Sequence, residues 1–259
     1  MSVVFSGVLP HSPILLPGPA AGHRHDLASI LTAATKLLTQ LADSQAEVIV
    51  IFSPHGAVVS DKFVVNTHYQ FQADLTDFGQ LTPLPPMAGA LALADQLYQA
   101  YPRLIQLFSE QQLDYGTAVP LLLAQPPLTA AILPFYSNDL STAEHWQAGL
   151  TLSAWWRQAP EKIALLASAD LSNCLNKKSA AGYNPRAKWF DKKILKALLN
   201  KQAPQLLTAD LDETAAELGA CGLKPLLLLA GSSAALAPQP QLLAYECPLG
   251  VGWPVIRLA

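Results

Sequence analysis

Two histidines of this chain each follow a proline at the end of an apolar, strand-like run, in LPHSP at residues 9–13 and in SPHG at residues 53–56. An imidazole at the end of a buried strand is held in one direction and is poorly solvated. If both strands belong to one sheet, the two rings can face a single point, and a metal ion is the commonest occupant of such a site. The pattern therefore indicates a metal site at His11 and His55, with two ordinary loop histidines as the alternative.

Two further segments place polar residues where a helix begins or a strand ends. Asp114 and Tyr115 precede an apolar helix start, where backbone N–H groups could receive an anion, and an ordinary turn is the alternative. Asp170 and Asn173 follow the apolar run at residues 162–168. These two residues stand at the same sheet edge as the two histidines if the strands run parallel.

Glu217 and Cys221 lie just before an apolar helix predicted for residues 223–230. Either side chain could complete a metal shell. The alternative is that Glu217 ends a helix in solvent and that Cys221 is simply a small buried residue. The remaining histidines are interpreted as ordinary surface, strand or helix residues: His23, His25, His68 and His145.

The elements that must position these residues alternate along the chain. Apolar runs predict strands at residues 3–9, 47–53, 62–69, 129–134, 162–168, 242–246 and 251–257. Helical periodicity predicts helices at residues 26–42, 86–101, 141–156 and 184–201, with a surface loop at 71–86. This alternation favours a single-domain α/β/α sandwich, spanning residues 1–259, around a mixed, largely parallel central sheet.

Composition narrows the class of protein. Hydrophobic residues make up 51% of the chain and charged residues 14%, so a large core can form, and the net charge of −3 argues against nucleic acid as a partner. No run is long enough for a membrane span and no signal peptide is evident, so we expect a cytoplasmic protein. Three cysteines without CxxC spacing are typical of free thiols. Half of the basic residues fall within residues 177–201, as a solvated helix face or a docking patch for an acidic partner.

Six segments in order resemble a known family: PHSPILLP, FSPHG, DYGTAVPL, SADLSN, ACGLKPLLLLAG and YECPLGVGWPV. Together, from residue 9 to about residue 255, they resemble the class III extradiol ring-cleavage dioxygenases of the catalytic-subunit-B type, in the bacterial branch close to the Memo-like proteins. The resemblance implies a non-haem Fe(II) held by two histidines and a carboxylate, a catechol-like aromatic substrate and O2. His11 and His55 match the two histidine ligands. Ring-cleaving members have glutamate as the third ligand and Memo-like members have cysteine, so the resemblance implies Glu217 or Cys221, with Glu217 slightly favoured.

The chain departs from this family at two positions in the expected pocket. Relatives carry histidine where this sequence has Tyr115 and Asn173. Asparagine cannot shuttle a proton near neutral pH, and a phenol is a poor base. The expected catalytic positions are thus Asp114, Tyr115, Asp170 and Asn173, with ring cleavage slow or absent.

Two further interpretations stay open at this point. The first is a non-catalytic, Memo-like metal- or ligand-binding scaffold, and the second, less favoured, is a zinc hydrolase that uses the same two histidines. Fe(II) is the expected cofactor of an active enzyme, and Zn(II) or no metal is the alternative. The sequence is compatible with a homo-oligomer or with a partner subunit that covers the cleft.

Overall fold

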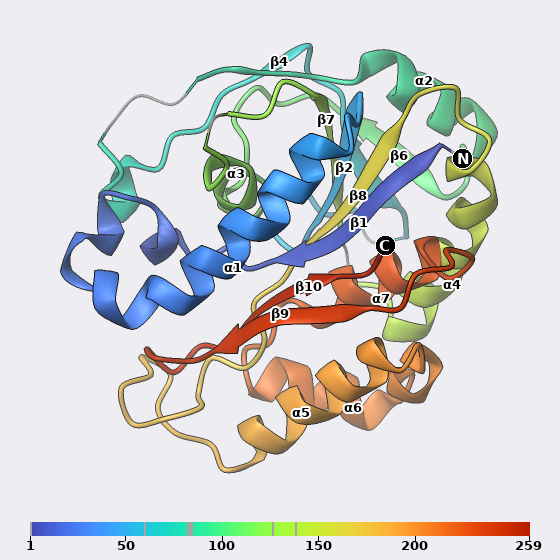
Figure 1. Ribbon diagram of the computed structural model, residues 1–259. Coiled ribbons are helices and arrows are strands. Elements are labelled where there is room, and N and C mark those ends of the chain that lie inside the picture. The colour runs from blue at the N-terminus through green and yellow to red at the C-terminus, as the bar shows by residue number, and fades with distance from the viewer. Residues whose placement is uncertain (1, 60, 82–84, 126, 138) are drawn as a thin grey trace.

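The computed structural model describes residues 2–59, 61–81, 85–125, 127–137 and 139–259. Within these ranges, eight strands form one sheet in the order β6-β3-β7-β2-β8-β1-β10-β9 (Figure 1). Their bounds are β1 Val3–Leu9, β2 Val48–Ser53, β3 Phe63–Asn66, β6 Ile105–Phe108, β7 Ala131–Tyr136, β8 Ile163–Ser168, β9 Gln241–Glu246 and β10 Trp253–Arg257. The four central strands, β7, β2, β8 and β1, run parallel, whereas β3 and β10 flank them antiparallel. The expected fold class, an α/β sandwich around a mixed and largely parallel sheet, is confirmed.

Helices cover both faces of this sheet (Figure 1). One apolar core contains the inward residues of α1 (Arg24–Asp43) and α3 (Tyr115–Leu122). The other contains those of α2 (Leu91–Ala100), α4 (Thr142–Trp156), α5 (Arg186–Leu199), α6 (Ala209–Glu217) and α7 (Leu223–Ser232). Short 3-10 turns occupy Pro13–Leu15, Pro19–Gly22, Thr76–Phe78 and Ala203–Leu206, and β4 (Gln70–Phe71) pairs with β5 (Met87–Ala88).

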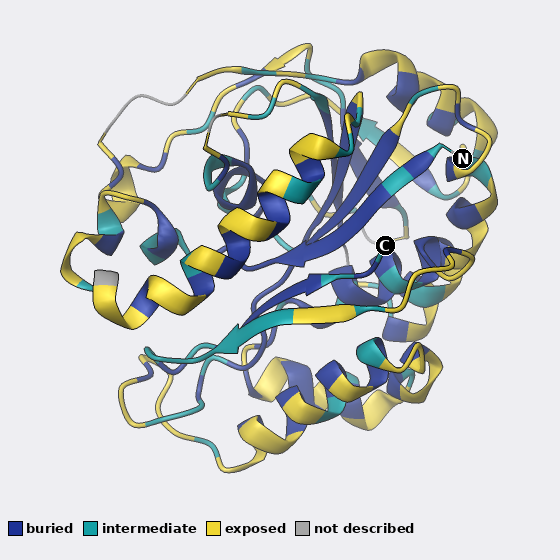
Figure 2. Cartoon of the chain, viewed as in Figure 1, coloured by how far each residue is buried: buried dark blue, intermediate teal, exposed yellow. Residues whose placement is uncertain are grey.

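The central strands are apolar on both sides because each side faces a core. In β2, Val50 and Phe52 belong to one core and Ile49 and Ile51 to the other. All residues of β2 and β8 are buried, as Figure 2 shows for the middle of the sheet. Sheets covered on both faces require such continuous apolar runs, which is why the strands were predictable from sequence.

Several elements differ from the expectation. The predicted helix at 86–101 is divided into β5 and α2 by Gly89, whose backbone approaches the His68 carbonyl too closely for any side chain. Strand β6 was not predicted, because its apolar run is only four residues long. Helix α6 ends at Glu217, as in the alternative in which that residue ends a helix in solvent. The predicted loop at 71–86 contains the turn Thr76–Phe78, and its residues 82–84 lie outside the described ranges.

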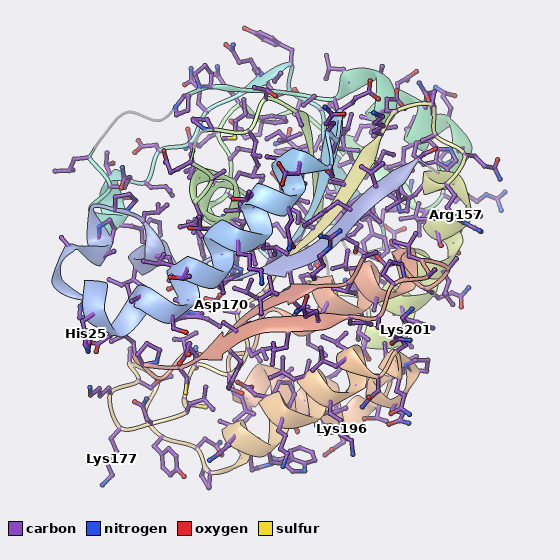
Figure 3. The ribbon with its side chains drawn as sticks, in the orientation of Figure 1. His25, Arg157, Asp170, Lys177, Lys196 and Lys201 are labelled. Atoms are coloured by element: carbon purple, nitrogen blue, oxygen red, sulfur yellow. The ribbon has the colours of Figure 1, made fainter. Side chains whose placement is uncertain are left out.

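Helix α5 presents its lysines to solvent. Lys188, Lys192 and Lys196 are exposed, whereas Phe190 and Ile194 are buried. Figure 3 labels Lys177 and Lys196 along this edge of the molecule. Trp189 lies on the same side as these lysines: it is 49% exposed, and Lys193 Nζ lies 5.1 Å from its ring centroid. Within the described ranges, no helix is both long and apolar enough to cross a membrane.

Candidate metal centre

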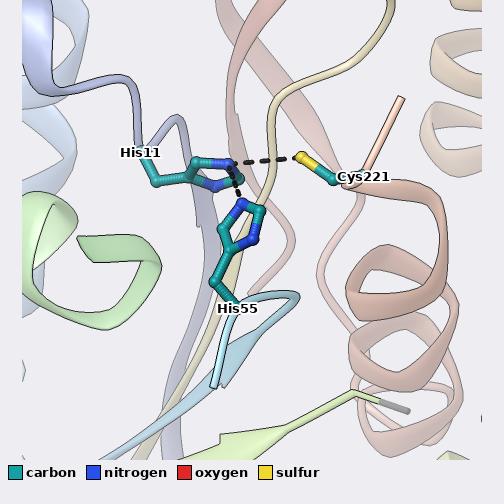
Figure 4. A group of neighbouring side chains, drawn as sticks. All are labelled: His11, His55 and Cys221. Atoms are coloured by element: carbon teal, nitrogen blue, oxygen red, sulfur yellow. Dashed lines mark hydrogen bonds between the residues drawn. The ribbon is translucent and has the colours of Figure 1, made fainter. Parts of the chain in front are cut away.

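Two parallel strand ends bring the two proline-flanked histidines together. His11 follows β1 and His55 follows β2, and these strands flank β8 on either side. Their Nε2 atoms are 3.2 Å apart, and the rings meet edge to face with centroids 4.9 Å apart (Figure 4). The structure therefore places both rings within reach of one ion.

Cys221 lies at the same point (Figure 4). Its Sγ is 3.3 Å from His11 Nε2, and one ligand atom from each of the three residues lies within 4.8 Å of the others. Cys221 precedes α7, and the next residue, Gly222, donates its backbone N–H to the Asp170 carbonyl at 2.9 Å. A side chain at Gly222 would collide with Asp170 and Ala169, so glycine permits the approach that delivers the thiol to the site.

The slight preference for Glu217 as the third member of this group is corrected by the geometry. Glu217 is the last residue of α6, where its carboxylate pairs with Arg186 Nη1 at 2.8 Å and accepts from Asn184 Nδ2 at 2.8 Å. Gly219, with a φ of 62°, then turns the chain back toward the sheet edge. The turn thus leaves the carboxylate at the surface and brings the thiol four positions later to the histidines.

Ser168, the last residue of β8, fixes the tautomer of His11. Its hydroxyl donates to the Gly116 carbonyl at 2.5 Å and also lies 2.9 Å from His11 Nδ1. Because the hydroxyl hydrogen is already used, His11 Nδ1 must be the donor to Ser168, and His11 Nε2 keeps its lone pair toward Cys221 and His55. A metal-binding histidine is commonly oriented in this way through its second nitrogen.

Burial keeps both imidazoles neutral. Desolvation lowers the pKa of His11 to about 3, against the opposing hydrogen bond at Ser168. The pKa of His55 falls to about 4, because burial and then the neighbouring His11 disfavour its charged form more than Asp170 favours it. Neutral imidazole is the form that binds metal ions.

Two acidic groups complete the immediate surroundings. Asp170 Oδ1 accepts the His11 backbone N–H at 3.0 Å, Oδ2 lies 3.9 Å from His11 Nε2, and burial raises the pKa of this carboxyl to about 7. Burial, followed by the nearby Asp170 charge, raises the pKa of the Cys221 thiol to about 12. The thiol therefore keeps its proton until a cation displaces it.

Asp114 and Tyr115 reach the site from the start of α3. Asp114 caps this helix by accepting from Thr117 N at 2.9 Å, and it accepts from the Ser53 hydroxyl at 2.6 Å. Tyr115 places its hydroxyl 2.8 Å from His55 Nε2 and stacks on the His55 ring with centroids 4.3 Å apart. Burial, more than the neighbouring acids, raises the pKa of Tyr115 to about 12.

Asn173 contacts the segment that carries Cys221. Its backbone N–H donates to the Leu218 carbonyl at 2.9 Å, and its side-chain amide packs against Gly219 so closely that a Cβ there would overlap with it. The structure thus brings together six of the eight residues expected at the site, places Asn173 against the adjoining loop and leaves Glu217 outside. Ser168 and Ser53 were missed. Each is the polar last residue of an apolar strand at the same sheet edge, and that position is the signal that could have identified them.

The three donor atoms fit a transition-metal ion. Tetrahedral Zn(II) with N and S ligands requires donor atoms about 3.3–3.6 Å apart, given bonds of about 2.0–2.3 Å. His11 Nε2 lies 3.2 Å from the His55 nitrogen and 3.3 Å from the Cys221 sulfur, close to these separations, and all three donor atoms lie within 4.8 Å of one another. Two imidazoles and a thiol suit borderline-soft ions, whereas the 2-His-1-carboxylate set of non-haem Fe(II) enzymes has a carboxylate where this group has Cys221.

A pocket of about 610 Å³ opens beside the thiol. Its walls come from the loop after β2, the segment between β7 and α4, and the ends of α6 and α7. They include Pro54, Ser137, Leu140, Ala216, Cys221, Leu223 and Lys224. A small molecule in this pocket would therefore lie next to Cys221, the candidate ligand that lines it.

Comparison with known proteins identifies the family to which this chain belongs. The family described as the catalytic LigB subunit of aromatic ring-opening dioxygenase matches residues 7–243, and the chain belongs to this family. The protein CA_C1420 of Clostridium acetobutylicum is 24% identical over 264 residues, covering 97% of this chain and 56% of that protein, so the chain spans about half the length of this curated relative. The crystal structure of the uncharacterized protein JW3007 from Escherichia coli K12 matches with a TM-score of 0.69 at 20% identity, covering 98% of this chain and 99% of the other, which shows a shared fold.

Proposed function

We propose that this protein is a metal-binding member of the LigB family, with one transition-metal ion held by His11, His55 and Cys221. The observation that carries this proposal is the position of Cys221 Sγ, 3.3 Å from the His11 Nε2 lone pair. A thiolate draws the preference of the site toward Zn(II) and away from the oxygen-rich set that favours Fe(II). A bound ion would supply Lewis acidity to a small molecule in the adjacent pocket.

The protein's own residues prepare this site in three ways. Ser168 fixes the His11 ring, burial keeps both histidines neutral, and Gly222 lets the Cys221 segment approach. The convergence of these features on one point favours a ligand-binding role over two ordinary loop histidines.

Metal loading tests the proposal. After incubation with Zn(II) and removal of unbound ions, we expect elemental analysis to find one ion per chain. His55→Ala and Cys221→Ser should each weaken Zn(II) binding more than the about 10- to 100-fold lost when only an outer partner of a ligand is removed. Glu217→Gln and Cys247→Ser are the matched controls and should bind like the wild type. Unchanged affinity in both His55→Ala and Cys221→Ser would refute the proposed site.

A second candidate function is extradiol cleavage of catechol-like aromatics with Fe(II) and O2. The family match over residues 7–243 supports it. Tyr115 and Asn173 oppose it, because neither supplies the imidazole that the family resemblance implies for proton transfer. General acid-base assistance is worth about 10²- to 10⁴-fold in rate, so turnover should be slow.

Oxygen uptake separates the two candidates. With anaerobically loaded Fe(II) and a panel of catechols, we expect little O2 consumption by the wild type and more by Asn173→His. Asn173→Gln, which adds length without a titratable ring, is the control for packing against Gly219. Rapid turnover by the wild type would favour the dioxygenase over the metal-binding proposal.

A further inference from the structure

We propose that Tyr115 supplies the fourth ligand of this metal centre through its phenol oxygen, so that the complete donor set is two nitrogens, one sulfur and one oxygen. This inference rests on the proposed function, because it extends the same site. It assigns to a tyrosine a role in holding the ion rather than in moving protons.

The position of the hydroxyl is the first support. Tyr115 Oη is 2.8 Å from His55 Nε2, the same nitrogen that lies 3.2 Å from His11 Nε2. An ion bound to His55 Nε2 must take the place of this hydrogen bond. The phenol oxygen then either joins the coordination shell or moves away.

Joining the shell requires the smaller movement. Neighbouring nitrogen and oxygen ligands of a tetrahedral ion lie about 3.3 Å apart, so the 2.8 Å contact must lengthen by only about half an ångström. Moving away would break two ring contacts. The Tyr115 ring stacks on His55 with centroids 4.3 Å apart, and Phe78 packs on it at 5.4 Å.

The start of α3 holds the ring where it is. Tyr115 is the first residue of α3, directly after its N-cap Asp114. Both Asp114 oxygens accept hydrogen bonds, Oδ1 from Thr117 N and Ser53 Oγ and Oδ2 from Thr117 Oγ1. This carboxylate therefore has its own partners, and Tyr115 is the group on α3 that points its oxygen at His55.

The phenol joins the ion as a phenolate. The Asp170 carboxyl, whose Oδ2 lies 3.9 Å from His11 Nε2, is the other group that can balance the charge of a divalent ion with one thiolate. On binding, the metal–oxygen bond forms as the O–H bond breaks, the proton passes to solvent, and no oxidation state changes.

Near-ultraviolet difference spectroscopy tests this assignment directly. Zn(II) should produce the tyrosinate difference band when it is added to the wild type or to Tyr183→Phe, which removes the hydroxyl of an exposed tyrosine that precedes α5. Tyr115→Phe should lack the band and bind Zn(II) about 10- to 100-fold more weakly in chelator competition. Phenylalanine keeps the ring contacts, so the substitution removes only the oxygen.

The outcomes separate this inference from the proposed function. One Zn(II) per chain with no tyrosinate band in the wild type, or with the same band in Tyr115→Phe, overturns the role of Tyr115 and leaves the three-residue site standing. Failure of the wild type to bind Zn(II) overturns both. The wild-type spectrum needs no substitution, so the test holds even if Tyr115→Phe folds poorly.

Discussion

At the scale of single residues, His11 is fixed by partners away from its ligand atom. Ser168 holds its Nδ1 and Asp170 accepts its backbone N–H, and the Tyr115 ring stacks on His55. A ligand oriented before binding loses less freedom when an ion arrives. The serine at the end of β8 therefore matters as much to the site as the histidine it orients.

Asp170 gives a pH-dependent prediction at this scale. Burial raises the pKa of Asp170 from 3.8 to about 7. Below about pH 4 the carboxyl is therefore protonated in both the folded and the unfolded chain, and it does not lower the free energy of unfolding. As the pH rises toward 7, the unfolded chain ionises first, and the free energy of unfolding of the metal-free protein falls. Asp170→Asn keeps the acceptor for the His11 N–H and removes this loss.

We expect Asp170→Asn to raise the free energy of unfolding by about 2 kcal/mol at pH 8, half of what the full shift would give at about 1.4 kcal/mol per pKa unit. The gain should be smaller at pH 5. Urea unfolding of both metal-free proteins at the two pH values measures it. A gain that does not depend on pH, or a loss at pH 8, would show that the carboxylate is better solvated or paired than its surroundings indicate.

At the scale of elements, the strand ends and several helix starts were predictable, but how closely each helix approaches the strand ends was not. Residues 48–52 and 163–167 are apolar throughout, so their strand character, and the convergence of the residues that follow them, could be inferred from sequence. The choice between Glu217 and Cys221 could not, because it depends on the left-handed turn at Gly219 between α6 and α7. That turn is a property of the packed helices and leaves no periodic pattern in the chain.

The contact between Tyr115 and His55 could not be predicted from the sequence either. The sequence predicted a helix start at Asp114. The direction of the Tyr115 side chain, however, depends on how closely α3 approaches the end of β2. Gly116 permits that approach, since a Cβ there would lie 2.5 Å from Ser53 Oγ and 3.0 Å from His55 Cδ2. Such distances between elements that are far apart in the chain emerge only in the folded protein.

At the scale of the whole molecule, the parallel centre of the sheet creates the site. Strands β1, β8 and β2 end at one edge, and α3 and α7 begin there. Open sheets of parallel strands bind ligands at their carboxyl edge, which is where the pocket of about 610 Å³ lies. The family match covers the segments that form this edge. In the proposed metal site, Cys221 would be the ligand that sets the metal preference.

X-ray absorption at the zinc edge of the loaded protein identifies the atoms bound to the ion. We expect a sulfur scatterer together with nitrogen and oxygen, and the loss of sulfur in Cys221→Ser. A shell of nitrogen and oxygen alone in the wild type would rule out Cys221 as a ligand.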